Sequence, residues 1–578
     1  METVNIKING MPLSVPKGST ILEAARYAGI TIPTLCYMKE KNEIGACRIC
    51  VVEVKGARSL VASCVYPVNE GMEVFTNTPK VQRSRKITLE LILSTHDRKC
   101  LSCVRSGSCE LQKLCQEYGV DESRFEGANP SYEKDSSTDY LVRDNSKCVL
   151  CRRCVAACNA QAIGVIGANN RGFDSVIGCA FNHDLDEVAC VGCGQCIVNC
   201  PTGALREKDD TDKVFEALAD PTKHVVVQTA PSIRVTLGEC FGMPVGTNVK
   251  GKMAAALRRL GFDRVTDTDF GADMTIMEEA TEFIQRVQNG GVLPMITSCS
   301  PGWVKYCEHY YPELLPHLST CKSPQQMQGA CIKTWYAQQN GIDPKDIVSV
   351  SIMPCTAKKF EVGRDDQDAA GVADVDYALT TRELARMINR AHLDFVNLPD
   401  EDFDPVMGVS TGAAAIFGAT GGVMEAALRT AADVLEGKSV SEIDYEEVRG
   451  TKGIKEAVYN IAGMDVKVAA ASGLANAKEI LEKIAAGKAD YQFIEIMCCP
   501  GGCVNGGGQP MQPASVRNFT DLAGIRGKAL YEEDRNLPLR KSHESPLVKQ
   551  AYEEFFGEPG GHKAHEILHT KYVARKKY

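Results

Sequence analysis

The chain opens with a short segment in which apolar and polar residues alternate. This alternation runs over residues 4–8 and is followed directly by Asn9 and Gly10. Strict alternation predicts a half-buried β-strand, and Asn-Gly is typical of a two-residue hairpin turn. Thr20, with Glu23 three residues later, has the pattern of a capping box that starts a helix. The sequence therefore predicts a hairpin followed by a short helix.

The pattern changes several times along the rest of the chain. A helical, partly basic stretch begins at Thr78, and the polar segment 126–138 predicts a linker. Between 139 and 209 one cysteine pattern occurs twice. Beyond it, short apolar runs at 225–227 and 347–350 alternate with helical patterns, which predicts an α/β domain. The predicted domains are residues 1–78, 79–138, 139–209 and 210–578.

Composition narrows the possible functions. The 578 residues are 44% hydrophobic, and the net charge of −9 argues against a nucleic-acid partner, because binding phosphates needs a basic face. No apolar run reaches the length of about 18 residues that spans a membrane, and the first ten residues lack an export core. We therefore expect a soluble, cytoplasmic protein. Its 26 cysteines, 17 of them in the first 200 residues, then indicate metal binding rather than disulfides.

Two cysteine runs share the spacing C-x2-C-x2-C-x3-C, which resembles that of bacterial two-cluster ferredoxins. In that pattern the fourth cysteine of each run ligates the other cluster. The first run ends in Asn159 rather than proline, which leaves the ligands intact. Zinc is a remote alternative, because its sites use separated cysteine pairs. The predicted ligands of the two [4Fe–4S] clusters are Cys148, Cys151, Cys154 and Cys200 for one, and Cys190, Cys193, Cys196 and Cys158 for the other.

Two further cysteine groups precede these runs. The first resembles the [2Fe–2S] site of plant-type ferredoxins, with looser spacing, and consists of Cys36, Cys47, Cys50 and Cys64. The second could bind zinc by composition, but its position in line with other clusters favours a histidine-ligated [4Fe–4S] centre at His96, Cys100, Cys103 and Cys109. Cys115 is expected to be a small buried hydrophobe. Together the groups predict one [2Fe–2S] and three accessory [4Fe–4S] clusters.

Two segments of the last domain resemble familiar motifs but do not predict the corresponding functions. The segment from Gly246 to Lys252 nearly forms a phosphate-binding loop, but Met253 stands where a hydroxyl would bind Mg²⁺. His565-Glu566-x2-His569 matches the H-E-x-x-H of zinc proteases, yet no other protease signal accompanies it. A helix with exposed or hydrogen-bonded histidines is the better interpretation.

Three separated segments carry the most specific signal. They are Thr297-Ser-Cys-Ser-Pro-Gly-Trp303, Met353-Pro-Cys-Thr-Ala-Lys-Lys-Phe-Glu361 and Glu495-Ile-Met-Cys-Cys-Pro-Gly-Gly-Cys503. Together they resemble the three signatures of the [FeFe]-hydrogenase active-site domain. With the upstream modules, the resemblance covers nearly the whole chain, in the domain order of the large clostridial-type enzymes. It implies a multidomain α+β and α/β fold, with a plant-type ferredoxin-like β-grasp module, a His/Cys cluster module, a two-[4Fe–4S] ferredoxin-like module and a large α/β H-cluster domain.

The resemblance also implies a cofactor. The H-cluster of this family is a [4Fe–4S] cube joined through one cysteine to a two-iron unit that carries CO, CN⁻ and an azadithiolate. Carried over by position, Cys355, Cys499 and Cys503 ligate the cube, and Cys503 also bridges to the two-iron unit. Lys358 would hydrogen-bond one cyanide. The remaining contacts to the cofactor would come from Ala230, Pro231, Ser232, Met353 and Met497.

A proton path follows from the same resemblance. Glu279, Glu282 and Arg286 stand at i, i+3 and i+7 of a predicted helix and so share one face. Such a face is usually a solvated surface, and that alternative stays open. The family pattern makes it a relay from Arg286 through Glu282, Ser319 and Glu279 to Cys299. The thiol of Cys299 suits the last step because its pKa lies nearer neutrality than that of a hydroxyl.

One position departs from the family pattern. The first signature of the family has two adjacent cysteines, and here the second is Ser300. Either Ser300 binds the iron, or Cys299 becomes the ligand, or one iron of the cube lacks a protein ligand. We expect Ser300 Oγ to bind, although oxygen matches iron–sulfur sites less well than thiolate. Cys498 is an extra thiol, which we expect to serve in packing rather than in binding iron.

The sequence therefore predicts a ferredoxin hydrogenase that reversibly reduces two protons to H₂. Its expected partners are a ferredoxin, which exchanges electrons with it, and the maturation proteins that supply the H-cluster. Two alternatives stay open. The chain could be the catalytic subunit of an NAD-linked or electron-bifurcating hydrogenase with partner subunits, or a non-catalytic iron–sulfur assembly or H₂-sensing relative.

Overall fold

The N-terminal module is built on the predicted hairpin. The computed structural model describes residues 2–120, 124–125 and 127–577. The sheet order is β2-β1-β5-β3-β4, and α1 begins at the predicted capping box of Thr20 and Glu23. The hairpin and the helix are thus confirmed. The elements are β1 Thr3–Ile8, β2 Met11–Pro16, α1 Ile21–Tyr27, β3 Val51–Val54, β4 Val61–Ala62 and β5 Glu73–Phe75.

The next two modules are mostly loop and helix. The predicted linker has no helix or strand over its described residues 127–138, while Glu126 lies outside the described residues. In the repeated module, Leu150 and Gly192 occupy matching positions, and both have a positive φ, as do Arg152 and Gly194. The internal repeat is therefore also a repeat of backbone conformation. The elements are α2 Pro79–Ser94, α3 Glu110–Glu117, β6 Leu141–Arg143, α4 Arg153–Ala160, β7 Gly167–Asn169, β8 Val176–Gly178, α5 Gln195–Asn199 and β9 Leu205–Glu207.

The last domain contains two four-stranded sheets. The first, in the order β11-β10-β13-β14, is entirely parallel, and its strands include both predicted apolar runs. The second, β12-β17-β16-β15, is parallel except for β15. Parallel strands are buried on both faces and need covering helices. The strands are β10 His224–Thr229, β11 Arg264–Asp267, β12 Met295–Ile296, β13 Ile347–Met353, β14 Tyr377–Thr380, β15 Ile454–Ile461, β16 Met464–Ser472 and β17 Phe493–Met497.

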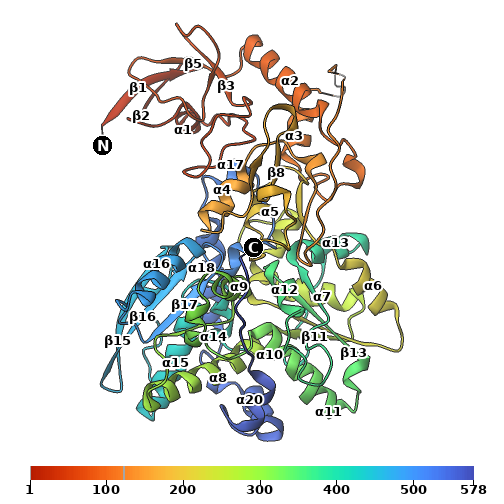
Figure 1. The fold of residues 1–578 in the computed structure, drawn as a ribbon, viewed down its shortest axis with the longest axis vertical. Helices are drawn as coiled ribbons and strands as arrows, with labels where there is room; N and C mark the ends of the chain where they lie inside the picture. The colour runs from red at the N-terminus through yellow and green to blue at the C-terminus, as the bar shows by residue number, and fades with distance from the viewer. Residues whose placement is uncertain (1, 121–123, 126, 578) are drawn as a thin grey trace.

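Helices surround both sheets (Figure 1). The longest is α8, whose buried face packs against α10 and α15. No described helix is long and apolar enough to cross a membrane. The helices of this domain are α6 Thr211–Ala219, α7 Lys250–Leu260, α8 Thr268–Asn289, α9 Pro301–Tyr310, α10 Pro324–Cys331, α11 Ala337–Asn340, α12 Ala357–Val362, α13 Thr381–Arg390, α14 Gly412–Ala415, α15 Gly422–Glu436, α16 Leu474–Ala485, α17 Ala514–Arg517, α18 Leu522–Asn536, α19 Pro546–Ala551 and α20 His562–Leu568.

Close backbone contacts join the cysteine-rich modules to this domain. A Cβ on Gly507 would lie 2.3 Å from the carbonyl oxygen of Cys193 and 2.5 Å from Cα of Gly194, so only glycine fits there. Near α17, Phe519 stacks on Tyr37 of the N-terminal module, with ring centroids 6.4 Å apart. Figure 1 shows the modules in sequence order from the N-terminal sheet, through α4 and α5, to the two large sheets. The C-terminal part of the chain therefore packs against the cysteine-rich modules that precede it.

The two rejected motifs have structural roles. Lys252 donates a hydrogen bond of 2.6 Å to the carbonyl oxygen of Leu398, so it supports a loop. His565 is exposed on α20, and His569 hydrogen-bonds to Glu278 and Thr320. The prediction of a helix with exposed or hydrogen-bonded histidines is therefore confirmed.

Candidate active site

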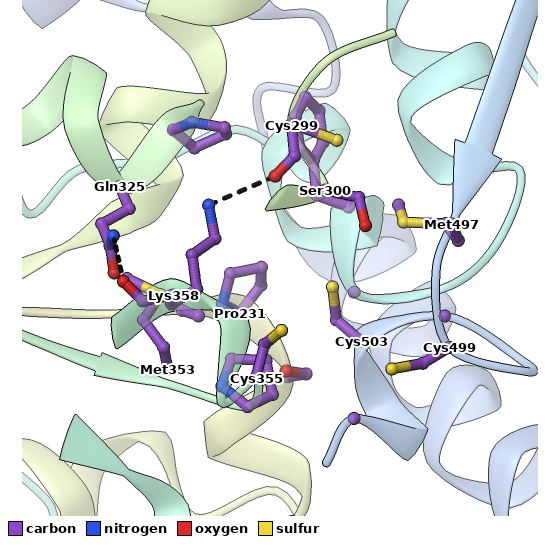
Figure 2. Close-up of a pocket in the computed structure, with 18 of the residues that line it drawn as sticks. Pro231, Cys299, Ser300, Gln325, Met353, Cys355, Lys358, Met497, Cys499 and Cys503 are labelled. Carbon is purple, nitrogen blue, oxygen red and sulfur yellow. Dashed lines mark hydrogen bonds between the residues drawn. The ribbon is translucent and has the colours of Figure 1, made fainter. Parts of the chain in front are cut away.

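The candidate site lies where strands of the two sheets end. Ser300 follows β12, Cys355 follows β13, and Cys499 and Cys503 follow β17. The carboxyl ends of parallel strands are where α/β proteins usually bind ligands, because loops from several strands meet there. Figure 2 shows the sulfur atoms of Cys355, Cys499 and Cys503 facing a common space. Residues far apart in the sequence are brought together by the two sheets.

One cavity contains every residue that the sequence resemblance assigned to binding the cofactor. Its wall also includes residues that were not predicted, among them Thr268, Gln325 and Phe417. The predicted residues that line it are Ala230, Pro231, Ser232, Cys299, Ser300, Met353, Cys355, Lys358, Met497, Cys499 and Cys503. The structure thus assembles the predicted set around one buried space.

Burial and neighbouring thiols change the pKa values of the cysteines in this cavity. Burial raises the pKa of Cys503 to about 12, and the neighbouring Cys499 contributes to the shift. Burial also raises the pKa of Cys355, with Cys499 and Cys503 the next contributors. A bound metal would displace these protons, because thiolate is the form that ligates. Three converging sulfurs in a mostly apolar cavity that two methionine thioethers also line fit a soft iron–sulfur cofactor.

Lys358 is held by a small polar network. Its ammonium donates to the carbonyl oxygen of Cys299 at 3.2 Å (Figure 2). It also donates to Ser323 Oγ at 2.8 Å. It also forms an ion pair of 2.8 Å with Glu361. The sequence analysis missed Glu361, although the i, i+3 spacing to Lys358 could have revealed it. Gln325, a further residue of the cavity wall, comes from α10, and no motif near it in the sequence predicts this position. The network therefore fixes the ammonium of Lys358 at the wall of the cavity, beside Cys299.

Ser300 and Cys498 are immediate neighbours. The backbone N–H of Cys498 donates to Ser300 Oγ at 3.2 Å, and both residues line the cavity. The Cys498 thiol is 2% exposed and lies close enough to the sulfurs of Cys193 and Cys499 to hydrogen-bond with them. Cys498 therefore packs between the cavity and the repeated cysteine module.

The predicted relay residues form a partly connected chain. Arg286 pairs with Glu282 at 2.6 Å, and Ser319 Oγ donates to the other oxygen of Glu282 at 2.9 Å. Glu282 and Arg286 are half-buried at the outer end, whereas Ser319 is fully buried. Cys299 lies at the inner end, where burial and the charge of Glu279 raise its pKa. The series therefore runs from the surface to the cavity wall.

Glu279 occupies the middle of this series. It is 1% exposed, and neither carboxylate oxygen has a hydrogen-bond partner among the described residues at normal distance and angle. Burial, followed by the charge of Glu282, raises the pKa of Glu279 to about 8, while the nearby Ser319 hydroxyl partly opposes the shift. Glu279 is therefore a neutral acid near pH 7, with a proton that it can release.

The sulfurs of the first cysteine group converge. Sγ of Cys50 and Sγ of Cys64 lie 3.3 Å apart. The hydrogen bond between Cys36 and Cys47 lowers the pKa of the latter to about 6. The charges of Cys36 and Cys47 also contribute to the raised pKa of Cys64. Two close sulfur pairs that influence each other, from one small module, suit a two-iron cluster.

The structure also brings the repeated cysteines together in crossed sets. One cavity is lined by Cys148, Cys151 and Cys154 of the first run together with Cys200 of the second. In the same way, the charges of Cys190 and Cys193 contribute to the raised pKa of Cys158, and the charge of Cys158 contributes to that of Cys196. This exchange of the fourth cysteine is the predicted grouping.

The His96 group is only partly brought together. The charge of Cys103 contributes to the raised pKa of Cys109, and the charges of Cys109 and Cys100 contribute to that of Cys115. These four cysteines are therefore neighbours. Nδ1 of His96 is buried, and no hydrogen-bond partner for it is found in the described part of the chain. An unpaired imidazole nitrogen fits a metal ligand. Cys115 is buried in a small apolar cluster, as expected.

Comparison with known families covers nearly the whole chain. The model described as "Iron only hydrogenase large subunit, C-terminal domain" matches residues 223–507, and "Iron hydrogenase small subunit" matches 521–575. Upstream, a 2Fe-2S iron-sulfur cluster binding domain matches 1–79, an NADH-ubiquinone oxidoreductase-G iron-sulfur binding region matches 85–124, and a 4Fe-4S dicluster domain matches 147–204. The fold and the site thus define an iron–sulfur oxidoreductase of the iron-only hydrogenase class.

Individual relatives agree. The "NADP-reducing hydrogenase subunit HndD" of Solidesulfovibrio fructosivorans is 49% identical over 100% of both chains. "Iron hydrogenase 1" of Clostridium pasteurianum is 45% identical over 98% of this chain and 99% of that one. An apo [FeFe]-hydrogenase structure from Chlamydomonas reinhardtii has a TM-score of 0.57 at 42% identity, covering 64% of this chain and all of that one. This chain belongs to the [FeFe]-hydrogenase family, with [2Fe–2S], [4Fe–4S] and H-cluster domains.

The raised pKa of Glu279 is directly measurable. Between its ordinary value of 4.5 and about 8, the folded chain binds this proton and the unfolded chain does not. The contribution of Glu279 to stability therefore falls as pH rises through this interval. We expect a carboxylic-acid C=O band in the infrared spectrum at pH 7 that disappears above about pH 8.

Two variants assign that band. Glu279→Gln should lack it. Glu282→Gln should keep a band that disappears at a lower pH, because the charge of Glu282 contributes to the raised pKa of Glu279 in the parent chain. A band that survives in Glu279→Gln would show that another buried acid carries the proton.

Proposed function

We propose that this chain catalyses the reversible reduction of two protons to H₂ at an H-cluster held in the cavity. The observation that carries the proposal is the convergence of Cys355, Cys499 and Cys503 at the ends of two sheets. When bound, the H-cluster supplies the metal centre at which protons and electrons combine. The non-catalytic alternative is less well supported, because similarity to hydrogenases extends over the full length of the chain.

The residues of the cavity divide the binding of this cofactor among them. Cys355, Cys499 and Cys503 would ligate the cube, and Cys503 would also connect it to the two-iron unit. Lys358 presents a cation to the cavity, which suits an anionic cyanide. The thioethers of Met353 and Met497 provide soft, polarizable contacts, and Ala230, Pro231 and Ser232 line the same cavity.

Protons would reach the cavity along the relay. Arg286 holds Glu282 at the outer end, Ser319 passes a proton inward by rotation of its hydroxyl, and Glu279 carries it toward Cys299. The support is the pKa of Glu279, which leaves the acid protonated near neutrality yet able to release its proton. The Cys299 thiol then holds a proton at the cavity wall.

Electrons would travel through one [2Fe–2S] and three [4Fe–4S] accessory clusters. The contact of Gly194 with Gly507 brings the repeated module against the loop that carries the cube ligands. Cys499 also lies 3.9 Å from the carbonyl oxygen of Cys193. This proximity supports direct electron transfer between the last accessory cluster and the cube. We place the enzyme in the cytoplasm, where maturation proteins would supply the two-iron unit.

A ferredoxin is the electron partner that we propose. The low potential of plant-type clusters, near −400 mV, makes exchange with such a carrier energetically reasonable. A second candidate is a multisubunit NAD(P)-linked hydrogenase in which this chain is the catalytic subunit. It is favoured by one observation, the 49% identity to a protein named as an NADP-reducing hydrogenase subunit.

The electron partner can be tested with the matured chain alone. We expect it to evolve H₂ from reduced ferredoxin at a rate comparable to that from reduced viologen. The control is the same chain with NADPH alone, which should give no H₂. Activity with NADPH only after flavin-containing partner subunits copurify, together with inactivity toward ferredoxin, would support the second candidate instead.

The role of Cys299 can be tested by exchanging its thiol for a hydroxyl. Cys299→Ser should lower H₂ evolution by about 10²–10⁴-fold, the usual contribution of a positioned acid or base. The CO and CN⁻ infrared bands of the cofactor should remain, because Cys299 is not assigned as a cube ligand. Unchanged turnover would show that the proton reaches the cofactor by another route.

The fourth ligand of the cube can be tested without the two-iron unit. We propose that Ser300 Oγ binds the iron and that Cys498 packs beside it. In protein produced without maturation proteins, Ser300→Cys should then shift the reduction potential and EPR signal of the cube, because thiolate is a softer ligand than oxygen. Cys498→Ala should change neither. The opposite pattern would identify Cys498 as the ligand.

A further inference from the structure

A second group of metal-ligating side chains lies near the outer end of the relay. Glu282, Cys321 and His569 each offer one ligand atom, and these atoms all lie within 4.8 Å of one another. They come from three separate parts of the chain: helix α8, the loop before α10 and the residue that follows α20. Carboxylate, thiolate and imidazole together are typical ligands of zinc. None of the four accessory clusters nor the active-site cavity uses Cys321 or His569.

The backbone holds two of these residues side by side. Cys321 and His569 form an isolated antiparallel β-bridge. The N–H of Lys322 donates to the carbonyl oxygen of Leu568 at 2.9 Å, and the N–H of Thr570 donates to that of Thr320 at 2.8 Å. The Cys321 and His569 side chains are therefore positioned by main-chain pairing rather than by flexible loops, which reduces the cost of organising a site.

A neighbouring carboxylate orients the imidazole. Glu278 is fully buried, and its Oε2 lies 3.1 Å from Nε2 of His569. A carboxylate at this nitrogen favours the tautomer with a proton on Nε2 and leaves a lone pair on Nδ1. Nδ1 currently lies 2.8 Å from the hydroxyl of Thr320. A histidine whose second nitrogen is bound by a carboxylate is the usual support for a zinc ligand.

The two oxygens of Glu282 both accept from the backbone N–H of Thr320, at 3.3 and 3.0 Å, but they have different side-chain partners. Oε1 takes the guanidinium of Arg286, at 2.6 Å, whereas Oε2 accepts from Ser319 Oγ at 2.9 Å. The Cys321 thiol also lies 3.7 Å from Oε2. A cation bound between Cys321 and His569 would thus compete with Ser319 for the same oxygen. The outer step of the proposed relay depends on that Ser319 contact.

Glu282 and His569 can be reached from solvent, whereas Cys321 is buried behind them and only 1% exposed. A surface cavity is lined by Glu282, Arg286, Thr320, His565 and His569, among others. The exposed His565 ring lies over His569, with centroids 4.3 Å apart. A cation that enters this cavity therefore meets His565, Glu282 and His569, with the buried Cys321 thiol beyond them.

We propose that Glu282, Cys321 and His569 form a site for a borderline-soft divalent cation such as Zn²⁺, and that the bound cation blocks proton entry. Binding would release the thiol proton of Cys321 to solvent as the metal–sulfur bond forms, with no change in oxidation state. The blocking role rests on the proposed relay, whereas the binding site does not. Zn²⁺ would then act as a reversible inhibitor.

Zinc binding is tested on the cluster-loaded protein with one molar equivalent of Zn²⁺. X-ray absorption at the zinc edge is not obscured by iron, and we expect one sulfur at about 2.3 Å with nitrogen and oxygen ligands at about 2.0 Å. Cys321→Ala and His569→Ala should each weaken zinc affinity by about tenfold or more. The matched control is Cys307→Ala, which removes a buried thiol elsewhere and should bind as the parent does. Equal binding by Cys321→Ala and the parent would overturn the site.

The block is tested separately with the matured enzyme and reduced viologen. Zn²⁺ should abolish most H₂ evolution by the parent, and a chelator should restore it, while the infrared bands of the cofactor stay unchanged. Cys321→Ala should remain active in the same Zn²⁺ concentration. Zinc bound through sulfur with no loss of turnover would overturn the blocking role. If the matured chain evolves no H₂ at all, the proposed function fails, and the zinc-edge result still decides the site.

Discussion

The site depends on a constraint of parallel sheets, namely that strand ends from distant parts of the chain meet at one edge. β13 and β17 belong to different sheets, yet the loops that follow them place Cys355, Cys499 and Cys503 around one cavity. Burial makes the thiols of Cys355 and Cys503 costly to ionise without a metal, as their raised pKa values show, whereas a hydrogen bond from Cys498 lowers the pKa of Cys499. Binding a cluster there relieves that cost, which links the chemistry of the site to its fold.

The proposed proton and electron routes both end at this cavity, and each depends on close packing. The proton route that we propose uses a buried acid, Glu279, whose neutral form avoids the cost of a charge in an apolar interior. The electron route that we propose uses the glycine contact between Gly194 and Gly507, which excludes side chains and so shortens the distance between modules. The zinc site that we infer lies at the outer end of the proposed proton route, beside the surface.

Much of this arrangement could be predicted from the sequence because its signals are local. Cysteine spacing predicted the crossed sets of the repeated module, and the helical spacing of Glu279, Glu282 and Arg286 predicted one face of α8. Contacts between distant segments gave no such signal. Gln325, the bridge between Cys321 and His569 and the packing of Cys498 beside Ser300 arise only when the chain is folded.

The central claim is that the sulfurs of Cys355, Cys499 and Cys503 hold one cluster. Its most direct test is iron content with Mössbauer spectroscopy on protein produced without the maturation proteins, for the parent and for Cys355→Ser, Cys499→Ser and Cys503→Ser. We predict that each variant loses or perturbs the same single [4Fe–4S] signal and keeps the accessory clusters. Three variants that affect different signals, or none, would contradict the account.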